Sequence, residues 1–593
     1  MIRELSDLGK FLRSTREEGT WIHDALKEEP VSMELIIDRG GVFQGLQLIE
    51  EKLTPAEAIT AKKGKARLLL DKPEEVLCYG GNAALKKHQL FLDKVALFKE
   101  IDEIAPVIAF YANGEIGLDK ALAHFEEIAA TGDKKIKKKI AGNISFRVLS
   151  DPVRIHEKPN VLQSVIDRYE AGQREQLANN TKACSVCGKS DYPVEDIPHG
   201  MIKKVPDGQS SGCALVSYNE NAFESYELKG NNNSSVCTNC AKTYVEGLNW
   251  LLANGSEVSI TDKKGKTITK FRYSNRRNFG SDTAMVFWTR DNRQLEEIEQ
   301  IEAPTEADVA RMIDSLSGGR EKDSKYLEAE RFYSCTLSGA AARIAVRDWI
   351  ETSLGDFRKS VVDWFKEIAI SRYDSEQGKM VTYYAPLYDL ARSCQRKNSD
   401  GSYDKDDTAT ARVAATLWQA ALHGGGVPLW ILTRALQRAR LDKYGVTAER
   451  AALIKLILRR TNNGGEVMIT ENEVEGKRPV AYVCGQIFAK LESIQYAALG
   501  DRNAGVREKY FTYAMTTPAA AFGRLFNLHS KHFTKLKSEK PGLAVTLDKE
   551  LQELCKDIEI DKFPQLFHLE EQGQFAIGYY HQKQAQFAGT HNK

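Results

Sequence analysis

Two apolar runs decide the fold class, Ser32-Met-Glu-Leu-Ile-Ile-Asp-Arg39 and Val42-Phe-Gln-Gly-Leu-Gln-Leu-Ile49, and Gly40-Gly41 separates them. Apolar and polar residues alternate on both sides of the glycine pair, which is typical of a β-hairpin. Further along the chain, Thr283-Ala-Met-Val-Phe-Trp-Thr289 predicts a buried strand. Strands therefore form part of the first half of the chain.

The composition is that of an ordinary globular protein of several domains. The chain has 593 residues, of which 42% are hydrophobic and 28% charged. Its 83 Lys and Arg balance 82 Asp and Glu, so a polyanion would have to be bound by local basic patches. Charges recur through the first 20 residues, which excludes a signal peptide there. No apolar run approaches the ~20 residues of a membrane-spanning helix, and we expect a cytoplasmic protein without membrane contact.

Two cysteine pairs carry the strongest local signal. Cys184-Ser-Val-Cys187 and Cys237-Thr-Asn-Cys240 supply four soft ligands, as a tetrahedral structural Zn²⁺ site requires. The long gap between the pairs indicates an inserted subdomain. The alternative is a set of unrelated buried thiols. Because four thiolates close the coordination shell, the predicted zinc is structural.

The predicted fold class is α+β. Amphipathic spacing predicts helices over residues 82–99 and 116–128, and from about residue 303 the pattern is mostly helical. We expect a mixed N-terminal half with an inserted zinc-binding subdomain, and an all-helical C-terminal half that ends in a helical bundle. The predicted domains are an α+β domain (1–180), a zinc-knuckle and strand-rich region (181–302), a helical region (303–466) and a C-terminal bundle (467–593).

Basic residues are segregated along the chain. Residues 265–293 hold seven Lys or Arg among interleaved aromatic residues, a composition typical of surfaces that bind nucleic acid. Residues 476–540 carry eleven basic and four acidic residues, which predicts a cationic face on the helical end. The alternative for any such run is a solvated helix face.

No catalytic signature is recognisable. The Gly188-Lys189-Ser190 sequence ends like a phosphate-binding loop, but Ala183 stands where that motif needs its first glycine. Clustered carboxylates or histidines for catalytic metals cannot be assembled from the sequence. We therefore expect a protein that is not an enzyme. The alternative is a zinc-binding nucleic-acid enzyme, such as a nuclease with an unrecognised site.

Several long motifs resemble one family. The sequence Gly208-Gln-Ser-Ser-Gly-Cys-Ala-Leu-Val-Ser-Tyr-Asn-Glu-Asn-Ala-Phe-Glu-Ser-Tyr226 resembles the large subunit of type I-C CRISPR surveillance complexes (type I-C Cascade). Further matches follow in order: a strand motif at 282–288, a central helix at 337–349, C-terminal helices at 481–492 and 517–524, and a final helix at 573–582. The resemblance spans essentially the whole chain.

The resemblance implies a non-catalytic role in antiviral defence. Such a subunit joins a guide-RNA ribonucleoprotein, recognises the protospacer-adjacent motif in double-stranded target DNA, and helps to open the duplex into an R-loop. It holds the displaced strand and recruits a separate helicase-nuclease. Guide pairing reads the remaining sequence, as in other guided effectors. The implied partners are the guide RNA, the target DNA, and the backbone and guide 5′-end subunits of Cascade.

Polar and basic residues are the predicted nucleic-acid contacts. Small polar groups beside glycines are candidates for motif reading, and basic residues for phosphate contacts; the alternative for the glycine-flanked positions is a tight structural loop. The predicted set is Asn82, Lys86, Lys87, Gln209, Ser210, Ser211, Asn219, Arg276, Arg277, Arg434, Arg438, Arg524 and Lys531.

The same resemblance implies small helical subunits encoded within the large-subunit gene. Translation from Met468 would give 126 residues with their own helical periodicity, over 480–499 and 510–536. Gly464-Gly465 lies just upstream, and tandem glycine codons can spell a purine-rich ribosome-binding sequence. The alternative is that Gly464-Gly465 forms a loop and Met468 is an internal residue.

Overall fold

The computed structural model describes the chain except for residues 16–22, 60–65, 132–133, 180–181, 197, 225, 262–264, 266, 318–327, 399–401, 404–407, 462–467, 501–504, 559–562 and 592–593. It divides into two compact units. The N-terminal unit comprises Ile2–Gly200 and Ser217–Gly247, and the C-terminal unit comprises Met1, Met201–Val216 and Leu248–Lys593. Helices and several small sheets mix in the chain, which confirms the α+β class.

A four-stranded sheet with the order β2-β1-β4-β3 organises the N-terminal unit. Strands β1 (Leu26–Ile37) and β2 (Phe43–Glu57) are antiparallel, which confirms the predicted hairpin. The Asp38 carboxylate accepts hydrogen bonds from the Gly40 and Val42 amides at 2.9 Å. Gly41 has a φ of +80°, and a Cβ there would lie 2.3 Å from the Phe110 nitrogen. The turn therefore needs a glycine at this position.

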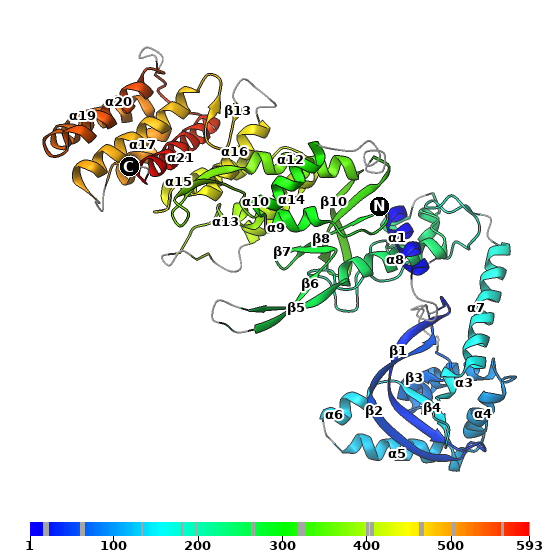
Figure 1. Cartoon of the computed structure of the whole chain (residues 1–593). Coiled ribbons are helices and arrows are strands. Elements are labelled where there is room, and N and C mark those ends of the chain that lie inside the picture. The colour runs from blue at the N-terminus through cyan, green and yellow to red at the C-terminus, as the bar shows by residue number, and fades with distance from the viewer. Residues whose placement is uncertain are drawn as a thin grey trace. The chain divides into compact units, whose positions relative to one another are not determined.

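Helices surround the bent β1–β2 hairpin of this unit (Figure 1). The core joins Met33, Leu35 and Ile37 of β1 to Phe91 and Phe146. The two helices predicted near the start of the chain are confirmed as α3 and α5. The remaining elements are α1 (Ile2–Ser14), β3 (Leu70–Asp71), α2 (Pro73–Val76), α3 (Leu85–Ala96), α4 (Ala105–Ala112), α5 (Leu118–Ala130), α6 (Lys134–Ile140), β4 (Ile144–Val148) and α7 (Pro159–Asn179), and α8 (Thr238–Ala253) begins in this unit.

An antiparallel sheet with the order β10-β9-β8-β7 begins the C-terminal unit. Its strands are β7 (Arg276–Phe279), β8 (Thr283–Thr289), β9 (Arg331–Ala340) and β10 (Arg343–Ser353). Strand β8 is buried along nearly its whole length, as predicted. A separate exposed hairpin pairs β5 (Gly255–Thr261) with β6 (Thr267–Tyr273).

The predicted central helix at 337–349 is wrong, because these residues form the β9–β10 hairpin. Ala341 makes the turn with a φ of +54°. The rings of Tyr333 and Trp349 stack across the two strands at 5.9 Å, and Trp288 of β8 lies 5.3 Å from Tyr333. Cross-strand aromatic packing therefore outweighs the helical propensity of the alanines. The prediction that the chain is all-helical after residue 303 is therefore wrong for the residues of β9 and β10.

Helices make up most of the rest of this unit, and the predicted terminal bundle is present. Two further short hairpins interrupt the helices, β11 (Ile370–Asp374) with β12 (Lys379–Tyr383) and β13 (Met468–Ile469) with β14 (Val474–Glu475). The helices are α9 (Glu296–Glu302), α10 (Glu306–Ser317), α12 (Leu354–Ile368), α13 (Leu387–Arg392), α14 (Thr408–His423), α15 (Leu429–Leu441), α16 (Ala448–Thr461), α17 (Val480–Leu499), α18 (Val506–Thr516), α19 (Pro518–Glu539), α20 (Pro541–Cys555) and α21 (Leu569–His591).

The terminal bundle is built around α17, which packs along α21 (Figure 1). Two glycines allow the two helices to approach closely. A Cβ on Gly485 would lie 2.1 Å from the Phe575 carbonyl oxygen, and one on Gly578 would lie 2.0 Å from that of Tyr482. Glycine therefore sets the spacing of the pair. Among the described residues, no helix combines the length and apolar character that crossing a membrane requires.

Candidate metal centre and nucleic-acid surfaces

The structure brings the four paired cysteines together. The Sγ atoms of Cys184, Cys187, Cys237 and Cys240 all lie within 4.8 Å of one another. Three of these cysteines are buried and Cys187 is half-buried. Cys240 lies in the first turn of α8, and the other three come from the loops that precede that helix in the chain.

Backbone amides point at these sulfurs. The amides of Val186 and Cys237 donate to the Cys184 Sγ at 3.4 and 3.3 Å, and the Cys240 amide donates to the Cys237 Sγ at 3.5 Å. Gly188 closes the first turn with a φ of +72° and donates to the Cys184 carbonyl at 2.8 Å. Such amides favour thiolates over thiols.

The arrangement fits a tetrahedral thiolate-bound metal. Zn–S bonds of about 2.3 Å would place the sulfurs roughly 3.8 Å apart, so separations within 4.8 Å need only a small contraction. Hydrogen bonding from Cys237 lowers the pKa of Cys240 to about 5, and the same contact raises the pKa of Cys237. This contact therefore favours the thiolate at Cys240 and the thiol at Cys237.

Two arginines predicted to contact phosphate are engaged within the fold. Arg276, 7% exposed, donates to the carbonyls of Lys204 and Leu252 at 2.8 and 3.1 Å. Arg277 pairs with Glu302 at 2.5 Å and lies over the Phe287 ring. Of the basic and aromatic stretch at 265–293, strand β6 carries an exposed group of Lys270, Phe271 and Arg272. Figure 1 shows the β5–β6 hairpin, which carries these residues, projecting from the rest of its unit.

The glycine-flanked loop is held at both ends and exposed between them. Gly208 forms a bridge to Ala341 at the β9–β10 turn, and the Gly339 amide donates to the Pro206 carbonyl at 2.8 Å. A Cβ on Gly339 would lie 2.5 Å from the Asp207 carbonyl carbon. The predicted residues of this loop, Gln209, Ser210 and Ser211, are exposed. The loop thus offers polar side chains on a fixed backbone.

The predicted positions in the N-terminal unit are also exposed. Asn82 lies in a single 3₁₀ turn after Gly80, whose φ is +106°. Lys86 and Lys87 begin α3, and Lys87 lies 3.5 Å from Glu75. Asn219 is exposed in the same unit. These four positions are available to a partner.

The predicted cations on the helices differ in exposure. Arg524 and Lys531 are exposed on α19, which also exposes Lys535 and Lys537. Arg434 and Arg438 are half-buried on α15, and Arg438 lies 3.9 Å from Asp442. The exposed predicted cations in the C-terminal unit therefore concentrate on α19.

Three buried polar side chains form a hydrogen-bonded group that resembles a catalytic arrangement. The sequence analysis did not predict this group. The Ser145 Oγ lies 2.7 Å from the His156 Nδ1, and the Thr54 Oγ1 lies 3.2 Å from its Nε2. Burial lowers the pKa of His156 to about 4, and all three side chains are buried. No substrate can reach this Ser145, so the group is structural. Within the described part of the chain, the cysteines are the one metal-ligand cluster.

The comparison with protein families covers nearly the whole chain. The model of the family described as CRISPR-associated protein (Cas_Csd1) matches residues 10–587. No curated protein sequence matches the chain. The match confirms the resemblance inferred from the motifs at 208–226 and beyond. The chain therefore belongs to the Cas_Csd1 family of CRISPR-associated proteins, the large subunits of type I-C Cascade.

Proposed function

We propose that this Cascade subunit recognises the protospacer-adjacent motif in duplex DNA, helps to open the duplex, holds the displaced strand and recruits a separate helicase-nuclease. The guide RNA, the backbone subunits and the guide 5′-end subunit are its proposed partners. The subunit performs these steps by binding, without a catalytic centre. The family match supports membership of the complex. The exposed polar positions support a role in reading bases, and the exposed basic positions support a role in holding the displaced strand.

The observation that carries the proposal is the exposed Gln209-Ser210-Ser211 segment on its anchored loop. Amide and hydroxyl groups read donors and acceptors on base edges, and a fixed backbone reduces the entropy lost on binding. Asn82, between exposed neighbours, offers a second amide. Neither position adds charge, so both suit base reading better than phosphate contact.

Binding of duplex DNA by the assembled, guide-loaded complex tests this role. With matched targets that differ only in the adjacent motif, Gln209→Ala and Asn82→Ala should each weaken binding about 5–100-fold on the preferred motif and much less on others. Gln552→Ala, an exposed glutamine on α20, is the matched control and should leave binding unchanged. Equal losses on every motif would show that Gln209 and Asn82 only position the DNA.

The exposed cations of α19 are the proposed contacts for the displaced strand. Arg524, Lys531, Lys535 and Lys537 lie on one helix of the terminal bundle, and spaced cations can follow a phosphate backbone. Arg434 and Arg438 on α15 are proposed as weaker contributors, because both are half-buried. Zinc at the four cysteines is proposed to have a structural role in the N-terminal unit.

A further inference from the structure

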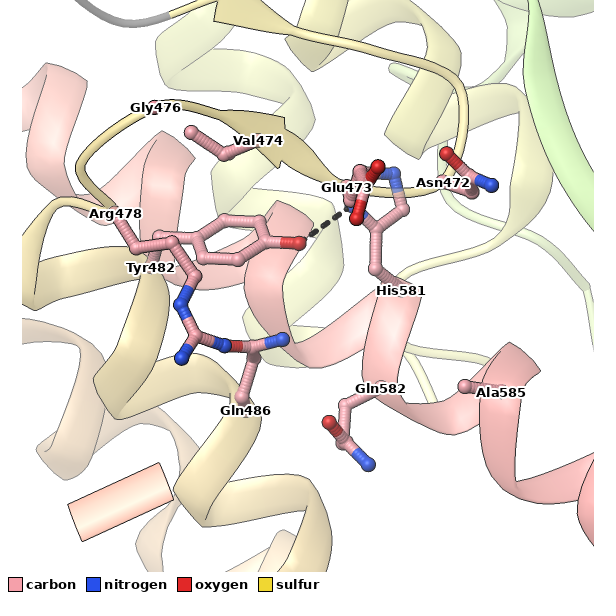
Figure 2. Close-up of a pocket in the computed structure, with 10 residues that line it drawn as sticks. All are labelled: Asn472, Glu473, Val474, Gly476, Arg478, Tyr482, Gln486, His581, Gln582 and Ala585. Atoms are coloured by element: carbon pink, nitrogen blue, oxygen red, sulfur yellow. Dashed lines mark hydrogen bonds between the residues drawn. The ribbon is translucent and has the colours of Figure 1, made fainter. Parts of the chain in front are cut away.

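A cavity of ≈310 Å³ lies between the β13–β14 hairpin, α17 and α21 (Figure 2). Its volume is at the lower end of the range for small-molecule sites, roughly 300–1,000 Å³. Polar side chains line it from all three elements: Asn472 and Glu473 from the hairpin turn, Arg478 and Gln486 from the start of α17 and the residues before it, and His581 and Gln582 from α21. Such a lining suits a ligand that hydrogen-bonds.

After Tyr482, which is 1% exposed, His581 is the most buried polar side chain in the lining. It is 4% exposed, and its Nδ1 lies 2.9 Å from the Tyr482 hydroxyl. Burial and, to a smaller extent, the positive charge of Lys455 lower the pKa of His581 to about 3, and a hydrogen bond to the Glu471 backbone opposes them only weakly. A neutral, buried imidazole therefore lies at the base of the cavity, held by the Tyr482 hydroxyl.

The charges around the cavity disfavour an anion. Arg478 forms an ion pair with Asp557 and donates to the Gln486 Oε1 at 3.2 Å. The Glu473 carboxylate is exposed at the rim and makes no hydrogen bond or ion pair among the residues described. A phosphate would meet this carboxylate and an arginine that is already neutralised. A metal cation would meet Arg478 and a single carboxylate, which is too few ligands.

The free hydrogen-bonding groups instead match an uncharged heterocycle. Glu473 can accept from an exocyclic amine, as carboxylates accept from cytosine N4. The Gln486 Nε2 remains a donor because its Oε1 is used by Arg478. The Gln582 amide offers both a donor and an acceptor, and Asn472 offers its Nδ2 as a donor while its Oδ1 accepts from the Thr470 hydroxyl at 3.2 Å. We propose that this cavity binds an unpaired nucleobase that carries an exocyclic amino group, adenine or cytosine. The proposal rests on the proposed function only for the source of the base, a single strand held by the same subunit.

Nucleoside binding by the purified full-length chain tests the proposal without DNA or guide RNA. Adenosine and cytidine should give saturable signals in ligand-observed NMR and in titration calorimetry, and uridine should bind at least about fivefold more weakly, because it lacks the amine that Glu473 accepts from. Glu473→Gln should weaken adenosine and cytidine binding by a similar factor. The matched control is Glu475→Gln on the same hairpin, which is exposed and outside the cavity. It should bind like the unmodified chain.

Three results would overturn the proposal: no saturable binding of any nucleoside, equal binding by Glu473→Gln and the unmodified chain, or binding of a capped dipeptide without any nucleoside binding. Gln582→Ala, on the half-buried face of α21, is a second variant that should weaken nucleoside binding and does not disturb the deep Tyr482–His581 pair. Duplex binding by the assembled complex is measured separately. Failure of the nucleobase site and failure of motif recognition are therefore distinguishable.

Discussion

The Cys184 Sγ accepts a hydrogen bond from the Cys237 amide at 3.3 Å, so the first residue of one cysteine pair is tied to the first residue of the other. Both side chains are buried, and 52 residues separate them in the sequence. The bond closes the inserted segment onto itself at the cysteine cluster. A metal bound there would make this closure far stronger, because metal binding to a site absent from the unfolded chain contributes directly to folding.

Zinc content tests the cluster. The chain purified under reducing conditions without chelators should contain about one zinc, since four thiolates make one closed site. Cys184→Ser should lose the metal and lower the thermal stability of the N-terminal unit. Cys555→Ser is the control, because Cys555 lies in α20 and outside the cluster. A metal-free native chain, or full zinc content in Cys184→Ser, would show that the cysteines have another role.

Arg276 and the α19 cations should respond differently to substitution. Arg276→Ala leaves the carbonyls of Lys204 and Leu252 without their partner and should cost about 1–3 kcal/mol of stability. Arg524→Gln and Lys531→Gln should leave stability unchanged, and each should lower the salt slope of DNA binding by about one unit. Denaturation and salt titration of the assembled complex measure both effects. An unchanged salt slope in the Arg524→Gln, Lys531→Gln double variant would remove α19 from the DNA-binding surface.

Lys455 should make stability depend on pH. Its side chain is fully buried on α16, the Nζ lies 3.4 Å from the Lys366 carbonyl, and burial lowers its pKa to about 7. An unfolded lysine keeps its proton up to about pH 10.4. Between these values the unfolded chain binds the extra proton, so stability should rise with pH over about 7–10 and be lowest below pH 7.

Lys455→Met should remove that pH dependence and stabilise the C-terminal unit at pH 6 by about 1–3 kcal/mol, because a buried amine is replaced by an apolar chain of similar size. Hydrogen exchange of α16 amides measured at several pH values gives the change. Lys359→Met, an exposed lysine on α12, should leave the profile unaltered. The same slope in both variants would assign the pH dependence to another group.

The alternation and spacing of residue types were sufficient to predict those elements whose structure depends mainly on residues close in the sequence. The hairpin at 32–49 and the buried strand at 283–289 follow from their own residues. The spacing of each C-x-x-C pair likewise predicted a shared metal site, although the two pairs meet only through a tertiary contact. The failure at 337–349 has a tertiary cause. Four alanines and two arginines favour a helix locally, but the stacking of Trp349 on Tyr333 is visible only once β9 and β10 are paired.

The position of charged residues in the sequence likewise did not show which groups they bind in the folded chain. Arg276 and Arg277 stand among aromatic residues, as nucleic-acid contacts do, yet their guanidinium groups bind carbonyls and a carboxylate of the fold. The carbonyl of Leu252 reaches Arg276 from 24 residues away, a contact that no local pattern records. The cavity beside His581 was missed for the same reason, since α17 and α21 meet only in the folded chain.

The segment from Met468 onwards is the subject of the last prediction, a second product of the same gene. It contains β13, β14 and the helices α17 to α21, so a chain of 126 residues would have the bundle built around α17. The proposed initiation signal at Gly464-Gly465 lies outside the described residues. Met468 is 48% exposed on β13, so Met468→Ala should leave the full-length fold intact.

In the full-length chain, α21 also covers α16. Gly573 packs against Leu458 and Ile454, and the Tyr580 hydroxyl donates to the Ser371 carbonyl at 3.2 Å. A separate 126-residue chain would leave this face of α21 uncovered, so it should be recovered with the complex rather than as a free monomer. Met468→Ala with silently recoded Gly464-Gly465 should abolish the small chain, and supplying residues 468–593 from a second gene should restore it to the complex. Assembly with normal DNA affinity in the absence of any small chain would show that internal initiation has no role.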